Sequence, residues 1–75
     1  MPSTKTKDPS LARVTSRITT LVNQAGGVAE VANTLGVSRQ TVYNWTGGEY
    51  HPDLASLIRI SKVLHVDVNW LLGLR

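Results

Sequence analysis

The sequence predicts an all-α fold of five short helices in one small domain. Apolar residues recur at three- and four-residue spacing, which places side chains on one face of a helix. Glycines, serines and aspartates of the types that end or begin helices stand where these runs stop and start. A domain of 75 residues buries only roughly 60% of the surface that its unfolded chain exposes. We therefore expect one small core and a partner that covers further apolar surface.

The first expected helix spans residues 11–25 and carries one apolar stripe. The stripe consists of Leu11, Val14, Ile18, Leu21, Val22 and Ala25. Residues 1–10 are polar, contain two prolines and show no periodicity, so we expect a flexible basic arm there, followed by one domain over residues 11–75. Lys5 and Lys7 in this arm either reach around a polyanion or only increase solubility.

Residues 28–45, VAEVANTLGVSRQTVYNW, predict two short helices joined by a tight turn. Gly36 interrupts the apolar spacing and suits the left-handed residue that ends a helix. Ser38 can accept a hydrogen bond from the free N–H groups of the helix that follows, expected at about residues 39–46. Ala32 is small where two helices must cross closely. This ordered set is typical of a helix-turn-helix whose second helix is presented for binding. The inward residues are expected to be Val28, Val31, Ala32, Leu35, Val42 and Trp45.

Two further helices are expected after the glycine pair that stops the helix at 39–46. Pro52 or Asp53 opens the fourth, and Asp67 is the expected N-cap of a fifth at residues 68–74. The expected core-facing residues of the fourth helix are Leu54, Leu57, Ile58, Ser61 and Leu64. More than half of the circumference of the fifth helix is apolar, so it either wraps deeply into the core or forms a partner surface. The expected dimer residues are Val68, Leu71 and Leu74, with Ile60 and Val63 extending the surface.

Residues 28–45 resemble the helix-turn-helix of the phage-repressor type, the Cro and lambda-repressor-like (xenobiotic-response-element type) DNA-binding family. The resemblance rests on Ala32, on Gly36 and on apolar residues at Val31, Leu35, Val37, Val42 and Trp45. It continues through PDLASLIRISKVL and HVDVNWLLGL, and so covers about residues 11–74. It implies a compact five-helix domain, a main base-contacting role for Arg39, Gln40 and Asn44, and, as in some members, a two-fold dimer formed through the last helix.

The helix at 39–46 directs polar side chains outward, away from Val42 and Trp45. The candidate DNA base-reading residues are Ser38, Arg39, Gln40, Thr41 and Asn44. In the major groove, arginine pairs with guanine O6 and N7, and glutamine or asparagine pairs with adenine N6 and N7. The plain alternative is that each is an ordinary solvated side chain.

Phosphate contacts are expected beside these readers, from hydroxyls, backbone amides and a nearby arginine. The candidates are Arg17, Gly27, Tyr43, Thr46, Gly48 and Tyr50. Tyr43 contacts a thymine methyl group or a phosphate, or covers the turn. Many members of the family open the second helix with a phosphate-binding glutamine, and Val28 cannot replace it. Arg17 either compensates from the first helix or is solvated.

The charge distribution favours a polyanionic partner. The net charge is +3, and Glu30 is the only acidic residue between Pro9 and Gly48. The absence of cysteine and two separated histidines predict no metal site, and we expect no cofactor. His51 is expected in a loop and His65 at the surface or a helix end, so an enzyme is the poorest functional class. No apolar run of signal-peptide or membrane-span length is present, so we expect a cytoplasmic protein with no membrane contact.

The sequence therefore predicts a sequence-specific, double-stranded DNA-binding transcription regulator of the phage or bacterial repressor type. We expect a weak homodimer on a nearly palindromic operator. The alternative is a helix-turn-helix antitoxin or another regulator that binds a protein partner. An antitoxin would use an extra segment to grip its toxin, and only Arg75 follows Leu74.

Overall fold

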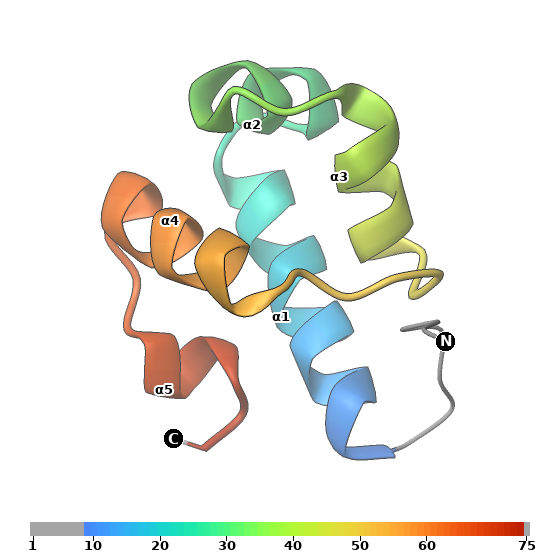
Figure 1. The fold of residues 1–75 in the computed structure, drawn as a ribbon, viewed down its shortest axis with the longest axis vertical. Helices are drawn as coiled ribbons and strands as arrows, with labels where there is room; N and C mark the ends of the chain where they lie inside the picture. The colour runs from blue at the N-terminus through green and yellow to red at the C-terminus, as the bar shows by residue number, and fades with distance from the viewer. Residues whose placement is uncertain (1–8, 75) are drawn as a thin grey trace.

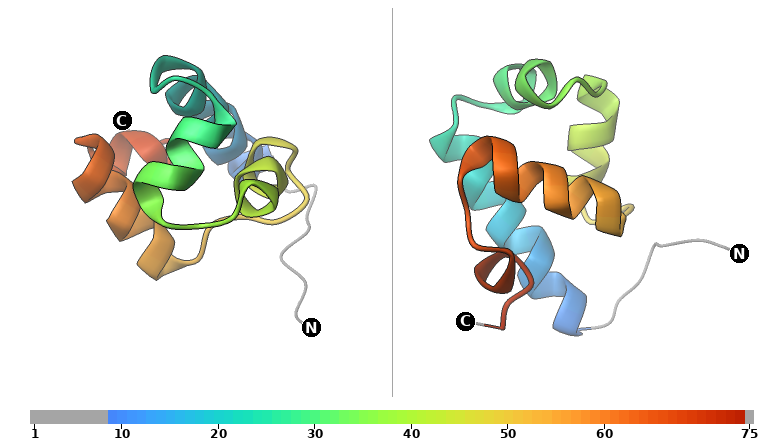
Figure 2. Two further views of the ribbon diagram at one scale, coloured as in Figure 1. Left: turned by 90° about the horizontal axis from the view of Figure 1, so that it is seen from above. Right: turned by 60° about the vertical axis from the view of Figure 1, so that its left-hand side comes forward.

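Five helices make up the part of the chain that the computed structural model describes, residues 9–74 (Figure 1). They are α1 (Pro9–Gln24), α2 (Val28–Leu35), α3 (Arg39–Thr46), α4 (Leu54–Leu64) and α5 (Val68–Leu71). The central helix α1 contacts α2, α3 and α5, and α4 contacts α2 and α5. Figures 1 and 2 show α3 on one side of α1 and the α4–α5 pair on the other. The predicted all-α fold of five helices is confirmed.

Helix α1 begins at Pro9, two residues earlier than the sequence predicted. Proline fits the first turn of a helix, because its fixed φ is already helical and no partner is needed there for a backbone N–H. Pro9 and Ser10 therefore belong to the helix, and its expected start at residue 11 is corrected to residue 9. Lys5 and Lys7 lie outside the described residues.

The corner between α2 and α3 forms as predicted. Gly36 has the left-handed φ of 73°, and the amide of Val37 donates to the carbonyl of Ala32 at 3.0 Å. Ser38 accepts a hydrogen bond from the amide of Thr41 at 3.1 Å, so it caps α3. Ala32 is buried at the crossing. These local bonds hold the start of α3 at a steep angle to α2.

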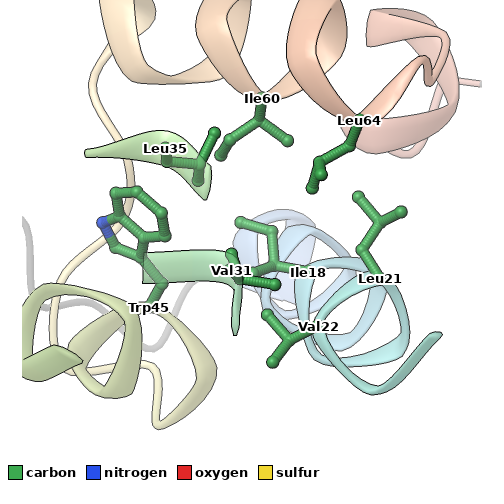
Figure 3. A pocket seen from close by; sticks show the side chains of 8 residues that line it. All are labelled: Ile18, Leu21, Val22, Val31, Leu35, Trp45, Ile60 and Leu64. Atoms are coloured by element: carbon green, nitrogen blue, oxygen red, sulfur yellow. The ribbon is translucent and has the colours of Figure 1, made fainter. Parts of the chain in front are cut away.

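The hydrophobic core lies where α1 to α4 meet, and α5 closes one side of it. Figure 3 shows α1, α2, α3 and α4 directing apolar side chains to a common centre. The buried residues are Val14, Ile18, Leu21, Val22, Val31, Ala32, Leu35, Val42, Trp45, Leu57, Ile60 and Leu71. The cavity left at this centre has a volume of about 10 Å³ and an entirely apolar lining. A space of this size and character does not hold water, because water needs polar partners.

Helix α4 packs on a different face from the one predicted. Leu54 and Ile58 are 71% and 44% exposed, whereas Leu57 and Ile60 are buried. At 100° per residue, Leu57, Ile60 and Leu64 fall within one narrow arc, and Leu54 and Ile58 lie on its flank. The sequence placed Leu54 and Ile58 in the core and Ile60 on a partner surface, and both assignments are wrong. Apolar residues of α4 lie on all sides of the helix, so their spacing alone did not identify the buried face.

Helix α5 is shorter than predicted, because it ends at Leu71 and Gly73 follows with a φ of 79°. Leu71 has no exposed surface and belongs to the core, so its assignment to a dimer interface is wrong. Val68 is half-buried and Leu74 is 72% exposed. The sequence left open whether the fifth helix packs deeply into the core or forms a partner surface. For Leu71, deep packing is observed.

Two arginines of α1 fasten α5 to the rest of the domain. The guanidinium of Arg17 lies over the indole ring of Trp70, 4.9 Å from its centroid, and donates a hydrogen bond to the carbonyl of the same residue. Arg13 donates to the carbonyl of Gly73 at 3.3 Å. A Cβ atom on Gly73 would lie 2.6 Å from Cδ of Arg13, so the close approach requires glycine. These arginines hold a helix end instead of facing α3.

The other helix ends carry the caps that the sequence indicated. Asp53 accepts a hydrogen bond from the amide of Ser56 at 2.8 Å. Hydrogen bonding with the side chain of Ser56, and then with its amide, holds the pKa of Asp53 below its usual value. Asp67 caps α5 through the amide of Asn69 at 2.8 Å. His65 is the exposed, left-handed C-cap of α4, as expected for a helix-end residue.

We predict that Ile60→Ala lowers the free energy of unfolding by about 2–5 kcal/mol, because it leaves a cavity in the core. Leu54→Ala is the matched control on the same helix and should change this free energy by no more than about 0.5 kcal/mol. Urea denaturation followed by circular dichroism measures both values. A larger loss in Leu54→Ala than in Ile60→Ala would show that α4 packs on the face predicted from the sequence.

Arg17→Ala should lower the free energy of unfolding by about 1–2 kcal/mol, because it removes the stacking on Trp70 and a hydrogen bond to a helix-end carbonyl. Arg17→Lys keeps the charge but loses the planar stacking group, so it should recover only part of this loss. The indole N–H resonance of Trp70 should shift in both variants. Unchanged stability and an unchanged resonance would contradict the role assigned to Arg17.

Candidate nucleic-acid interface

The outward face of α3 is set by the two residues that the helix buries. Val42 is fully buried and Trp45 is 6% exposed, so both are held in the core. Arg39 and Gln40, at the start of the helix, are exposed on the opposite side, and Asn44 is half-buried one turn later. Contacts of α3 with both α1 and α2 fix its orientation. The domain thus presents a short polar helix on a rigid support.

Ser38 and Thr41 are engaged with each other. Their hydroxyl oxygens lie 2.8 Å apart, and the amide of Thr41 donates to Ser38 Oγ. Ser38 is exposed and Thr41 is half-buried. Both lie beside Arg39 as the sequence predicted, but their hydroxyls serve the helix cap. These bonds use one of the two hydroxyl hydrogens, so the pair keeps one free donor, and base reading by Ser38 or Thr41 stays a prediction.

Gln40 and Asn44 are joined by a hydrogen bond, in which Nε2 of Gln40 donates to Oδ1 of Asn44 at 3.0 Å. Sequence analysis named both residues but missed their contact, although a four-residue spacing in a helix allows it. Arg39 has no hydrogen-bond or ion-pair partner among residues 9–74, and its side chain is exposed. The outward face therefore carries one free guanidinium and one linked pair of amides.

Several donors proposed for phosphate binding are used within the fold. The amide of Gly27 donates to the carbonyl of Val22 at 2.8 Å, and the amide of Gly48 donates to that of Trp45 at 3.3 Å. The hydroxyl of Thr46 donates to the carbonyl of Tyr43 at 3.2 Å. A phosphate oxygen only accepts hydrogen bonds, and the donor hydrogens of these three groups are already used within the fold. We assign Gly27, Gly48 and Thr46 to the fold and not to phosphate binding.

Two tyrosines remain as candidates beside α3. Tyr43 is 56% exposed on the helix, and Tyr50 is 49% exposed in the loop that follows. The amides of Glu49 and Tyr50 donate to the carbonyl of Asn44 at 3.0 and 3.3 Å, so this loop is folded back onto the end of α3. Both phenol groups are thus held near the candidate readers.

The start of α2 offers backbone N–H groups with no side-chain cap, because its N-cap is Gly27. Such groups favour an anion. Glu30 lies in the same first turn, and its negative charge opposes that preference. Val28 adds no polar side chain, as the sequence already indicated.

Fewer arginines are free to contact a ligand near α3 than the sequence suggested. Arg13 and Arg17 are bound to α5, and Arg59 donates to the carbonyl of Leu35 at 3.3 Å. Within residues 9–74, Arg39 is the arginine that faces outward from α3. The guanidinium of Arg17 is held against Trp70, which does not favour the predicted phosphate contact, and that contact stays a prediction.

The two histidines flank α4, one before its start and one after its end. His51 lies in the loop before α4, with Nε2 3.2 Å from Oγ1 of Thr15, and His65 ends α4. In the described part of the chain, no group of three or more potential metal ligands is found. No helix between residues 9 and 74 is both long enough and apolar enough to cross a membrane.

Comparison with known proteins places this geometry in a family. Residues 28–71, from the first residue of α2 to the last of α5, match the family model described as helix-turn-helix. The chain belongs to this helix-turn-helix family. It is 36% identical over 55 residues to an uncharacterized HTH-type transcriptional regulator of Haemophilus influenzae (strain ATCC 51907 / DSM 11121 / KW20 / Rd).

This similarity covers 73% of the chain but only 23% of the Haemophilus protein, so the chain spans about a quarter of that relative. No solved structure matches the chain. The resemblance inferred from Ala32, Gly36 and the buried positions of the motif is confirmed by the family match.

Proposed function

We propose that this chain is a sequence-specific, double-stranded DNA-binding transcription regulator that reads the major groove of an operator with α3. The proposal rests mainly on one observation, the polar outward face of α3 on a helix held rigidly by Val42 and Trp45. A helix of this kind fits the major groove with its N-terminal residues against the bases. Membership of the helix-turn-helix family and the printed name of the Haemophilus relative support it.

Arg39 is the proposed guanine reader. Its guanidinium has the fork geometry that pairs with guanine O6 and N7, and no partner among residues 9–74 competes for it. Tyr43 and Tyr50 position the domain by contacting phosphates on either side. The uncapped first turn of α2 adds a backbone contact, as helix starts do with phosphate oxygens.

We further propose that the regulator is a cytoplasmic repressor of phage or bacterial type, which acts by occupying its operator and excluding polymerase. Its role is binding and not catalysis, because the polar side chains at α3 are arranged as donors and acceptors for a ligand. His51 and His65 lie in a loop and at a helix end, apart from this face.

A weak two-fold dimer on a nearly palindromic site completes the proposal. With Leu71 in the core, the large aliphatic side chains exposed on α4 and after α5 are Leu54, Ile58, Val63 and Leu74. A standard interface buries about 800 Å² on each partner, which is more than these few side chains provide, so assembly depends on the DNA. The longest dimension of the domain is 28 Å, so two copies fit on half-sites about 34 Å apart.

Arg39→Ala should weaken binding to the selected operator by about 1–3 kcal/mol and relax preference at one base pair in each half-site. Lys62→Ala is the matched control, because it removes the same charge from an exposed site on α4. Selection from a random duplex pool identifies the operator, and titrations against single-base variants measure the preference.

Equal weakening of every duplex by Arg39→Ala would make Arg39 a phosphate contact. If the parent protein selects no sequence from the pool, the proposed function is wrong.

The parent should bind a full site more tightly than a half-site, and Leu54→Asp or Leu74→Asp should reduce this difference. Both residues are more than two-thirds exposed, so the variants should keep the helical content of the parent. Sedimentation with each duplex gives the stoichiometry. Ser16→Asp, at an exposed polar site on α1, is the control for added negative charge. If both variants bind the full site as tightly as the parent, and the parent binds the half-site equally tightly, a dimer through these surfaces is ruled out.

A further inference from the structure

We propose that Gln40 and Asn44 act as one unit that reads a single adenine, with each amide supplying half of the recognition. This inference rests on the proposed function and names a base that the site selects. It starts from the hydrogen bond between the two side chains, which the free structure already contains. Neither residue would read a base on its own.

The bond leaves a defined set of free groups. Nε2 of Gln40 donates to Oδ1 of Asn44 at 3.0 Å, so Oε1 of Gln40 remains as an acceptor, and Nδ2 of Asn44 and the second hydrogen of Nε2 remain as donors. If both amide groups were rotated by 180°, the free pair would again be one donor and one acceptor. The linked side chains therefore offer an acceptor from one amide and a donor from the other on the exposed side of α3.

This pattern matches one base edge in the major groove. Adenine offers the N6 amino group as a donor and N7 as an acceptor. Oε1 of Gln40 would accept from N6, and Nδ2 of Asn44 would donate to N7. Guanine offers two acceptors, N7 and O6, so the free oxygen of Gln40 would face another oxygen. Thymine and cytosine each provide only one of the two required hydrogen-bonding groups.

The surroundings favour joint action. Ser38 and Thr41 bond to each other and do not compete for either amide. The carbonyl of Asn44 accepts the amides of Glu49 and Tyr50, which holds this end of α3 in place. A side chain that is already positioned loses less rotamer freedom on binding. Removing either amide should therefore disable the other.

The test is a double-mutant cycle with Gln40→Ala, Asn44→Ala and the double variant, each titrated against the selected operator and against its A·T to G·C substitution. The parent should prefer adenine by roughly 5- to 150-fold, the range of one good bidentate pair. Each single variant should lose most of this preference, and the double variant should lose little more. Asn33→Ala, an exposed amide on α2, is the matched control and should keep the parent preference.

Base analogues locate the two contacts. Purine in place of adenine removes the N6 amino group, and 7-deazaadenine removes the N7 acceptor. Each should weaken binding of the parent, and neither should further weaken binding of the double variant. Circular dichroism of all variants checks that α3 remains folded.

The inference is overturned if either single variant retains the adenine preference, or if the two losses add at separate base pairs. In that result Arg39→Ala would still relax its own base pair, and the proposed function would stand. A parent protein that selects no duplex would instead overturn both.

Discussion

Burial of Val42 and Trp45 is the interaction on which the proposed reading face depends. These two side chains lie one turn apart and commit one side of α3 to the core, so the other side must face outward. The turn before them adds a second constraint, because Gly36 ends α2 and Ser38 caps α3 within three residues. A short helix of eight residues would be marginal alone in water. Here the core and the cap together hold it.

The charge of the chain serves two separate purposes. Arg13 and Arg17 bind carbonyl groups at the end of α5, and Arg17 also stacks on Trp70. Cations near the C-terminal end of a helix offset its partial negative charge. Arg39 is left exposed at the start of α3. Net charge therefore overstates the number of cationic side chains that are free to contact a ligand near α3, and the proposed specificity rests on a few side chains with free donors and acceptors.

Much of the candidate site was predictable because its determinants are local. The helix boundaries at Gly36 and Ser38 and the inward pair in α3 follow from bonds and spacings within a few residues. The same spacing placed Arg39 and Gln40 on the outward face. The link between Gln40 and Asn44 was also readable in principle, since side chains four residues apart in a helix lie next to each other. The hydrogen bonds that the amides of Gly27 and Gly48 make within the fold were not predictable, because their conformation depends on neighbouring turns.

The sequence by itself determined five helices, their caps and the polar face of α3, because hydrogen bonds within one turn and helical periodicity specify these features. Only the tertiary structure decided which face of α4 is buried, since apolar residues surround that helix and its packing against α2 and α5 selects Ile60 over Leu54. The tertiary structure also decided which group the side chain of Arg17 contacts, because its partner Trp70 is 53 residues away in the sequence. Contacts over such distances depend on how all the helices share one core, and no local pattern records them.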